Sequence, residues 1–201
     1  MCGRFSNQWP RSRWEAVLGP LSWVGEGPEP SPHFAPGDRI WVWTEPGQVR
    51  AMRWGWQADW LGGRLLINAR AETAASRPTF RPYVRQRGLV LADAFYEWQH
   101  LAQAKPRPYR LARADGEPLL LAALWRRTDS LEEAAVILTE PMFPALSWLH
   151  DRQPVAIGLA QALAWLAGAL PMQRVSSEAI SGWDAEPVES SWFSRWHRSA
   201  R

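Results

Sequence analysis

The sequence has little cysteine, little lysine and no long apolar run. Its single cysteine, Cys2, cannot form an intramolecular disulfide, which suits a reducing compartment. No run approaches the ~18 apolar residues of a membrane-spanning helix. The first residues also lack the charged-then-apolar pattern of a signal peptide. We therefore expect a cytoplasmic protein.

Several catalytic motifs are also missing. There is no glycine-rich phosphate loop and no G-x-S-x-G sequence. His33, His100 and His197 show no metal-ligand spacing with Cys2, so we expect no metal. No cofactor is expected. The only lysine is Lys105, within the turn-like KPRPY. An enzyme that forms a Schiff base normally uses a lysine amine, and here the α-amine of the chain is the better candidate.

The 201 residues fit one domain of globular composition, 46% hydrophobic and 21% charged. Short apolar or alternating runs predict strands, and few helices separate them. The fold class expected is α+β, with mixed or antiparallel sheets that curl into a barrel-like core. The stretch 19–36, rich in proline and glycine, predicts a loop. Strands are expected at 39–43, 49–56, 64–68, 88–99, 109–113, 119–127, 134–139 and 153–159, and helices at 10–18, 69–76 and 160–168.

Positive charge is unevenly distributed. The net charge is only +3. The segment 50–87, however, carries eight arginines against Asp59 and Glu72, so it contributes +6 and the remainder −3. A basic patch of this kind favours an anionic partner such as nucleic acid. The alternative is a solvated, arginine-rich surface with no partner.

Cys2 becomes the N-terminal residue once the initiator methionine is removed. It then carries a thiol and a free amine on adjacent carbons. The α-amine has a reference pKa of ~7.7–8.0 against ~10.4 for lysine, so a larger fraction is neutral and nucleophilic. Such an amine condenses with an aldehyde, and the thiol can close a five-membered thiazolidine. Two alternatives stay open: thiolate attack on an acyl carbon, and a small buried cysteine with no chemistry.

Three further stretches contain polar residues suited to chemistry. In LINARAET, Asn68 caps the expected helix or Arg70 binds a phosphate. In ADAFYEWQ, Glu97 lies between aromatic residues whose burial would raise its pKa; the alternative is a solvent-facing glutamate. In WLHDRQPV, His150 can transfer protons and Arg152 can bind phosphate, or Asp151 can pair locally with Arg152.

Together these motifs resemble one family. MCGRF, RWG, INARAET, LADAFYEW, AALW, ILT and HDRQPV occur in the order found in the SRAP family, whose name stands for SOS-response-associated peptidase. The resemblance runs from residue 2 to about residue 166, with 167–201 expected to pack on the body of one domain spanning 1–201. It implies a compact α+β fold with a curved, β-rich core, and a protein that shields abasic sites in DNA.

The resemblance also implies roles for particular residues. Cys2 would form the covalent crosslink to the ring-opened abasic sugar in single-stranded DNA, as a thiazolidine. Asn68 would position the α-amine, Glu97 would act in acid–base steps including reversal of the crosslink, and His150 would assist the imine chemistry. The resemblance further implies an associated abasic-site lyase activity and an autoproteolytic peptidase activity. The DNA-binding residues implied are Arg4, Trp60, Arg70, Arg77 and Arg152.

Four positions depart from the family pattern. Gly88 stands where many members have a second cysteine, Ala94 where a glycine precedes FYEW, and Gln153 where HDRMP has methionine. Phe34 replaces an asparagine and puts one local contact in doubt. The competing functions are an N-terminal-nucleophile amidase or peptidase and a non-catalytic nucleic-acid binder. We expect a monomer that is associated with the nucleoid when bound to DNA, at abasic sites or single-strand/duplex junctions.

Overall fold

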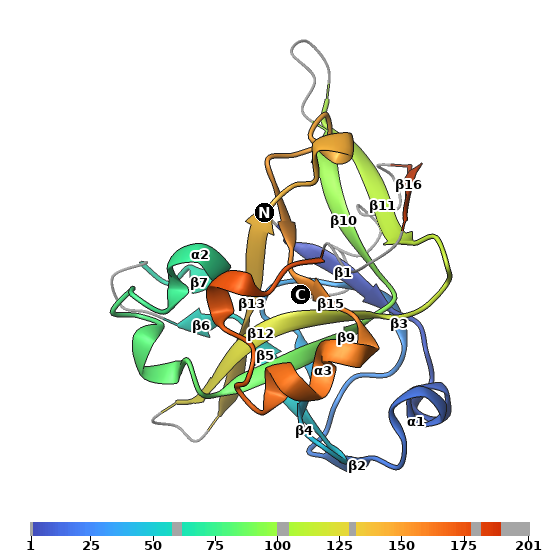
Figure 1. Ribbon diagram of the computed structural model, residues 1–201. Helices are drawn as coiled ribbons and strands as arrows, with labels where there is room; N and C mark the ends of the chain where they lie inside the picture. The colour runs from blue at the N-terminus through green and yellow to red at the C-terminus, as the bar shows by residue number, and fades with distance from the viewer. Residues whose placement is uncertain (1, 58–61, 100–104, 129–131, 178–181, 190–201) are drawn as a thin grey trace.

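Short strands make up most of the structure (Figure 1). The computed structural model describes residues 2–57, 62–99, 105–128, 132–177 and 182–189. None of the helices in these ranges is long and apolar enough to cross a membrane. The strands are β1 (Arg4–Asn7), β2 (Ser22–Val24), β3 (Ser31–Phe34), β4 (Arg39–Glu45), β5 (Gln48–Trp54), β6 (Trp56–Gln57), β7 (Leu65–Leu66), β8 (Asn68–Arg70), β9 (Arg87–Ala92), β10 (Ala94–Gln99), β11 (Arg107–Arg113), β12 (Leu119–Arg127), β13 (Glu133–Pro141), β14 (Arg152–Pro154), β15 (Ala156–Ile157) and β16 (Trp183–Pro187). The helices are α1 (Arg11–Leu18), α2 (Ala71–Ala74) and α3 (Leu159–Leu166), with 3-10 turns η2 (Arg81–Tyr83), η3 (Pro144–Leu146) and η4 (Met172–Arg174).

The larger sheet closes on itself. Its strands follow the order β14-β13-β12-β9-β4-β5-β2, and β13 also pairs with β5 in parallel, with Ala134 opposite Arg53. This gives a ring of hydrogen-bonded strands through β5, β4, β9, β12 and β13. The ring is not an even barrel, because β2, β8, β14 and β15 attach to individual members of it. The predicted α+β class with mixed, curled sheets is confirmed.

A second sheet adjoins the first at the connection between β9 and β10. Its order is β16-β11-β10-β1-β3. Asp93 stands at the junction, and its carboxylate accepts hydrogen bonds from the Ser6 hydroxyl and the Gln8 backbone N–H. These contacts fix β1, and with it the start of the chain, against β10. Figure 1 shows β1 beside β10.

Two hydrophobic cores lie on either side of the larger sheet. One contains Trp14, Trp56 and Trp165, and the other is built around Phe5 and Trp54. Burial of such large aromatic side chains contributes much of the favourable free energy of folding. Phe34, the departure noted above, is 5% exposed and stacks on Phe5 with ring centroids 5.1 Å apart. It is therefore a core residue.

The expected loop at 19–36 was wrong in part, because it contains two strands. Strand β2 pairs in parallel with β5, and β3 pairs antiparallel with β1. Both lie at sheet edges, where proline is tolerated because one side of the strand needs no partner. The sequence SPHF of β3 shows no alternation, so only the long-range pairing makes it a strand.

The expected helix cap at Asn68 was also wrong. Helix α2 is four residues long, and the residue that precedes it, Arg70, is extended. Asn68 instead lies in β8, which pairs in parallel with β13 and places Asn68 opposite Ile137. This strand pairing removes Asn68 from the helix and directs its amide to another partner.

Gly88 is explained by a close approach between β9 and β4. A Cβ atom at this position would lie 2.5 Å from Val42 Cγ1. We expect Gly88→Cys to lower the free energy of unfolding by about 1–3 kcal/mol, as overpacking does, and Val42→Ala in the same chain to restore part of it. Urea denaturation measures both. Gly158→Cys is the control, because Gly158 has open space around its Cβ position. Equal stability of Gly88→Cys and the parent protein would contradict this explanation.

Candidate active site

Cys2 is fully buried, two residues before the start of β1. Its side chain has no exposed surface, and its thiol contacts the Arg4 carbonyl oxygen at 3.8 Å. The Asn68 Nδ2 donates a hydrogen bond of 2.9 Å to the Cys2 carbonyl oxygen. The other amide atom, Asn68 Oδ1, is buried and has no hydrogen-bond partner among the described residues. The site therefore holds the Cys2 backbone and offers one unused acceptor beside it.

Glu97 lies on β10, the strand next to β1. The two strands pair with Arg4 opposite Tyr96, so Glu97 is one residue from the start of β1. The side chain is 2% exposed, and burial raises its pKa to about 7, with the negative charge of Asp151 adding to the effect. Burial also raises the pKa of the Cys2 thiol, and the charge of Glu97 raises it further. Near neutral pH the thiol is protonated, whereas Glu97 populates both its forms.

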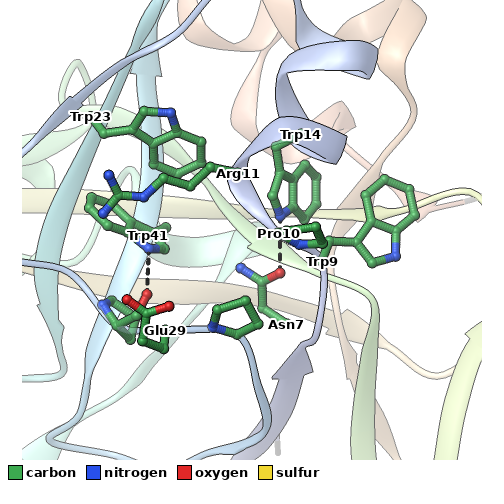
Figure 2. Close-up of a pocket in the computed structure, with 10 residues that line it drawn as sticks. Asn7, Trp9, Pro10, Arg11, Trp14, Trp23, Glu29 and Trp41 are labelled. Atoms are coloured by element: carbon green, nitrogen blue, oxygen red, sulfur yellow. Dashed lines mark hydrogen bonds between the residues drawn. The ribbon is translucent and has the colours of Figure 1, made fainter.

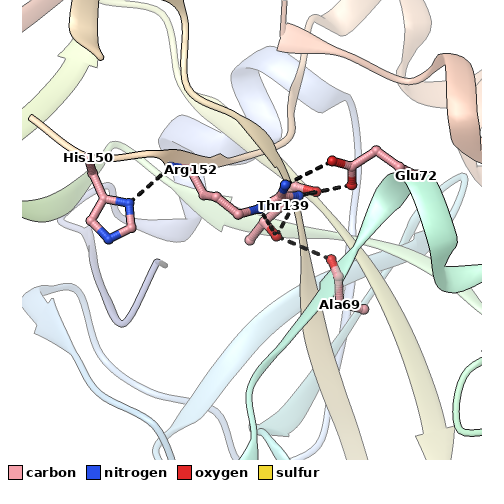
Figure 3. Close-up of polar contacts among 5 residues, drawn as sticks. All are labelled: Ala69, Glu72, Thr139, His150 and Arg152. Atoms are coloured by element: carbon pink, nitrogen blue, oxygen red, sulfur yellow. Dashed lines mark hydrogen bonds and ion pairs between the residues drawn. The ribbon is translucent and has the colours of Figure 1, made fainter. Parts of the chain in front are cut away.

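His150 is held by its backbone neighbours, between η3 and β14 (Figure 3). Its Nδ1 accepts a hydrogen bond of 3.0 Å from the Arg152 backbone N–H. The same nitrogen lies 2.7 Å from Asp151 Oδ1. The suggestion that Asp151 pairs with Arg152 was wrong, because Asp151 contacts His150 and the Arg152 guanidinium binds elsewhere.

Arg152 is buried in an ion pair. Its guanidinium donates to both Glu72 carboxylate oxygens, at 2.8 and 2.9 Å, and to the Thr139 carbonyl oxygen at 2.7 Å (Figure 3). Hydrogen bonds from Arg152 hold the pKa of Glu72 below its usual range. Arg152 is 8% exposed, so most of its binding capacity is already used within the protein. A direct contact with DNA stays a prediction.

The remaining predicted DNA-binding residues occupy different settings. Arg4 is half-buried and donates to the Gly3 carbonyl oxygen at 2.7 Å, and burial lowers its pKa. Arg70 and Arg77 are exposed on either side of α2. Trp60 lies outside the described residues. The structure thus brings Cys2, Asn68 and Glu97 together and leaves two arginines exposed in the segment that follows Asn68.

The basic character of segment 50–87 is smaller than the charge count indicates. Arg50 pairs with Glu133 at 3.2 Å, and Arg53 pairs with Glu132 at 3.7 Å. Arg87 is half-buried and donates to the Leu170 carbonyl oxygen at 2.5 Å. These three arginines make contacts within the fold. The exposed arginines of α2, η2 and their flanks are Arg70, Arg77, Arg81 and Arg85.

Thr139, beside the site, was missed by sequence reasoning. Thr139 lies in AAVILT, which indicates only a buried strand, and its role as an acceptor for Arg152 follows from the antiparallel pairing of β13 and β14. Gln153, one of the departures noted above, is buried and donates to Glu140 at 3.1 Å. Among the described residues, no group of three histidine, cysteine or acidic side chains is placed to hold a metal ion.

A separate cavity of about 370 Å3 lies near the far end of β1 (Figure 2). The Arg11 guanidinium stacks over Trp23 and Trp41, 5.1 and 4.8 Å from their ring centroids, and covers part of these two rings. No described residue predicted for the site lines this cavity. Its walls are Asn7, Trp9, Pro10, Arg11, Trp14, Trp23, Pro28, Glu29, Pro30 and Trp41.

The curled sheet, with Cys2 bonded to the Asn68 amide and close to the buried Glu97 carboxyl, can be compared with known proteins. The family model for SOS response associated peptidase (SRAP) matches residues 1–191, and the chain belongs to this family. It is 30% identical to the abasic site processing protein YedK of Escherichia coli strain K12, over all of this chain and 93% of the relative. It is 28% identical to the abasic site processing protein YoqW of Bacillus subtilis strain 168, over 94% of this chain and 91% of the relative.

Solved structures share the fold. A protein from Bacteroides thetaiotaomicron superposes with a TM-score of 0.84 at 20% identity, over 96% of this chain and 94% of that one. A phage-related protein from Bordetella bronchiseptica gives a TM-score of 0.72 at 26% identity, over 94% and 95% of the two chains. The predicted family and fold are thereby confirmed.

Proposed function

We propose that this protein processes abasic sites in single-stranded DNA by a covalent crosslink through Cys2, which shields the lesion. The observation that carries the proposal is the hydrogen bond from Asn68 to the Cys2 carbonyl oxygen, beside the buried Glu97. An abasic site is a masked aldehyde, and an N-terminal cysteine is an aldehyde-trapping 1,2-aminothiol. The relatives named as abasic site processing proteins support this choice of substrate.

The proposed chemistry releases one water. After removal of Met1, the neutral α-amine adds to the C1′ aldehyde of the ring-opened sugar. The carbinolamine loses water to form an imine. The Cys2 sulfur then adds to the imine carbon, and the thiol proton passes to the nitrogen, which closes the thiazolidine. β-Elimination from the same imine would give the associated lyase activity.

Each polar residue has a role that its setting supports. Asn68 Oδ1, the unused buried acceptor, would accept a hydrogen from the α-amine and direct its lone pair. Glu97, with a pKa of about 7, would protonate the sugar oxygen during ring opening and the carbinolamine hydroxyl that leaves as water, and would act in reverse to resolve the crosslink. Asp151 acts electrostatically on Glu97 and also contacts His150, which supports a role for His150 in the same proton transfers.

The full burial of the Cys2 thiol argues against the alternative, an N-terminal-nucleophile peptidase. Such an enzyme attacks as a thiolate, which burial disfavours. The decisive comparison uses two single-stranded oligonucleotides, one with an abasic site and one with a tetrahydrofuran analogue that has no aldehyde. We expect a band stable to denaturing electrophoresis with the first alone. A band with both, or amide hydrolysis without DNA, would contradict the proposal.

DNA binding is expected to depend on Arg70 and Arg77, the exposed arginines that flank α2. Each contact with a phosphate of single-stranded DNA contributes about −0.7 to the slope of log K against log salt. Arg70→Ala with Arg77→Ala should therefore reduce the slope by about 1.4, as measured by fluorescence anisotropy. Arg13→Ala, which removes an exposed arginine of α1, is the matched control. An unchanged slope in the double variant would mean that the DNA does not contact Arg70 and Arg77.

A further inference from the structure

His150 Nδ1 has two neighbours that require opposite protonation states. The Arg152 backbone N–H, at 3.0 Å, needs a lone pair on Nδ1. The Asp151 carboxylate, at 2.7 Å from the same atom, is satisfied only by a proton on it. One ring nitrogen cannot serve both at once, so whichever neighbour is held more firmly decides which nitrogen of the neutral ring carries the proton.

The Arg152 side is held firmly. Its guanidinium makes a bidentate pair with Glu72, the geometry in which arginine–carboxylate contacts are strongest. Three further hydrogen bonds reach Thr139, one to the carbonyl oxygen at 2.7 Å and two to Oγ1 at 3.2 and 3.3 Å. The Arg152 side chain is 10% exposed, whereas the Asp151 side chain is 82% exposed and free to turn into water. Figure 3 shows the continuous path from Glu72 through Arg152 to His150.

We propose that Glu72 is a positioning residue for His150. By holding the Arg152 guanidinium it adds to the β13–β14 pairing that keeps the Arg152 backbone N–H against His150 Nδ1, so that the neutral ring carries its proton on Nε2. His150 then enters the reaction as an N–H donor at Nε2. Loss of the bidentate Glu72 contact weakens this hold on Arg152, although β14 stays paired with β13. Asp151 can then capture a proton on Nδ1, which converts Nε2 into an acceptor.

The effect on catalysis rests on the proposed function, whereas the tautomer does not. Glu72 follows Asn68 by four residues, across the end of β8 and the start of α2. This one segment therefore places the amide that binds Cys2 and, through Arg152, the ring of His150. Its pairing with β13, which puts Thr139 opposite Arg70, brings both halves of the site to the same strand.

The experiment is ¹⁵N NMR of the full chain labelled at histidine, at a pH where the rings are neutral. The chain has four histidines, so His150→Asn assigns the signal. We expect the wild-type ring to show a protonated Nε2 and an unprotonated Nδ1. In Glu72→Gln, the Nδ1 signal should move toward the protonated position. Glu133→Gln is the matched control, because it removes an ion pair with Arg50 elsewhere on β13 and should leave His150 unchanged.

Two results would overturn the proposal. One is a wild-type ring with its proton on Nδ1, a test that depends on no variant. The other is a Glu72→Gln spectrum identical to the wild-type spectrum at His150. We also expect Glu72→Gln to slow crosslinking about tenfold, less than the ~10²-fold or greater loss typical of removing a general acid. Absence of crosslinking in the wild-type protein would refute the proposed function and leave the tautomer result standing.

Discussion

Replacing Cys2 by alanine is expected to abolish the covalent product with abasic DNA. The substitution keeps the α-amine but removes the sulfur that closes the ring, so only a hydrolysable imine can form. Non-covalent DNA binding should stay within about twofold of wild type, because the exposed arginines are untouched. Denaturing electrophoresis and anisotropy measure the two quantities on the same samples.

Cys2→Ser is the matched variant for separating the amine from the thiol. It retains a 1,2-amino-alcohol of nearly the same shape at the same buried position. We expect it to give no stable band, but to give one when borohydride is present to reduce the imine. A stable band from Cys2→Ala without reductant would contradict the account, since the bond would then involve another residue.

Glu97→Gln is expected to change both stability and rate, each with a defined pH dependence. The folded-state pKa of Glu97 is raised to about 7 from its ordinary value of 4.5. Below pH 4.5 the group is protonated in both states and does not affect stability. As pH rises toward 7, the unfolded state ionises first, so the folded protein loses stability through this window. Glu97→Gln should therefore be more stable than wild type at about pH 8, by on the order of 3 kcal/mol, and nearly equal at about pH 4.

The same substitution should lower the rate of crosslinking by about 10²-fold or more, because glutamine cannot transfer a proton. The wild-type rate should show a titration near pH 7 that is missing in the variant. Thermal denaturation across pH and single-turnover kinetics check the two effects separately. The control is Glu15→Gln, on α1. Asp93→Asn would not serve, because Asp93 anchors β1. If Glu97→Gln crosslinks at the wild-type rate at about pH 7, Glu97 takes no part in the proton transfers.

Much of the fold could be predicted because its central strands are apolar along their whole length. LLLAALWRR and AAVILT became β12 and β13, and the periodic segment after Gly158 became α3. The edge strands β2 and β3 could not be predicted, since their pairing is long-range and their surroundings, rich in proline, indicate a loop. Closure of the ring through β13 and β5 is likewise a tertiary contact with no local signal.

The candidate site divides in the same way. Cys2, Asn68 and Glu97 were singled out from short motifs, and the structure brings them together. The partner of Arg152 could not be read from its neighbours, because Asp151 is adjacent in sequence while Glu72 is 80 residues away. The charge count overestimated the exposed positive charge of segment 50–87. It cannot show that Arg50 and Arg53 already pair with Glu133 and Glu132.

The most direct test of the central claim is mass spectrometry of the purified protein, before and after mixing with a single-stranded oligonucleotide that carries one abasic site. The account predicts a protein that has lost Met1, then a product equal to protein plus DNA minus one water, with the adduct on the peptide that begins at Cys2. A protein that has lost Met1 and gains no adduct, or an adduct on any other peptide, would contradict it.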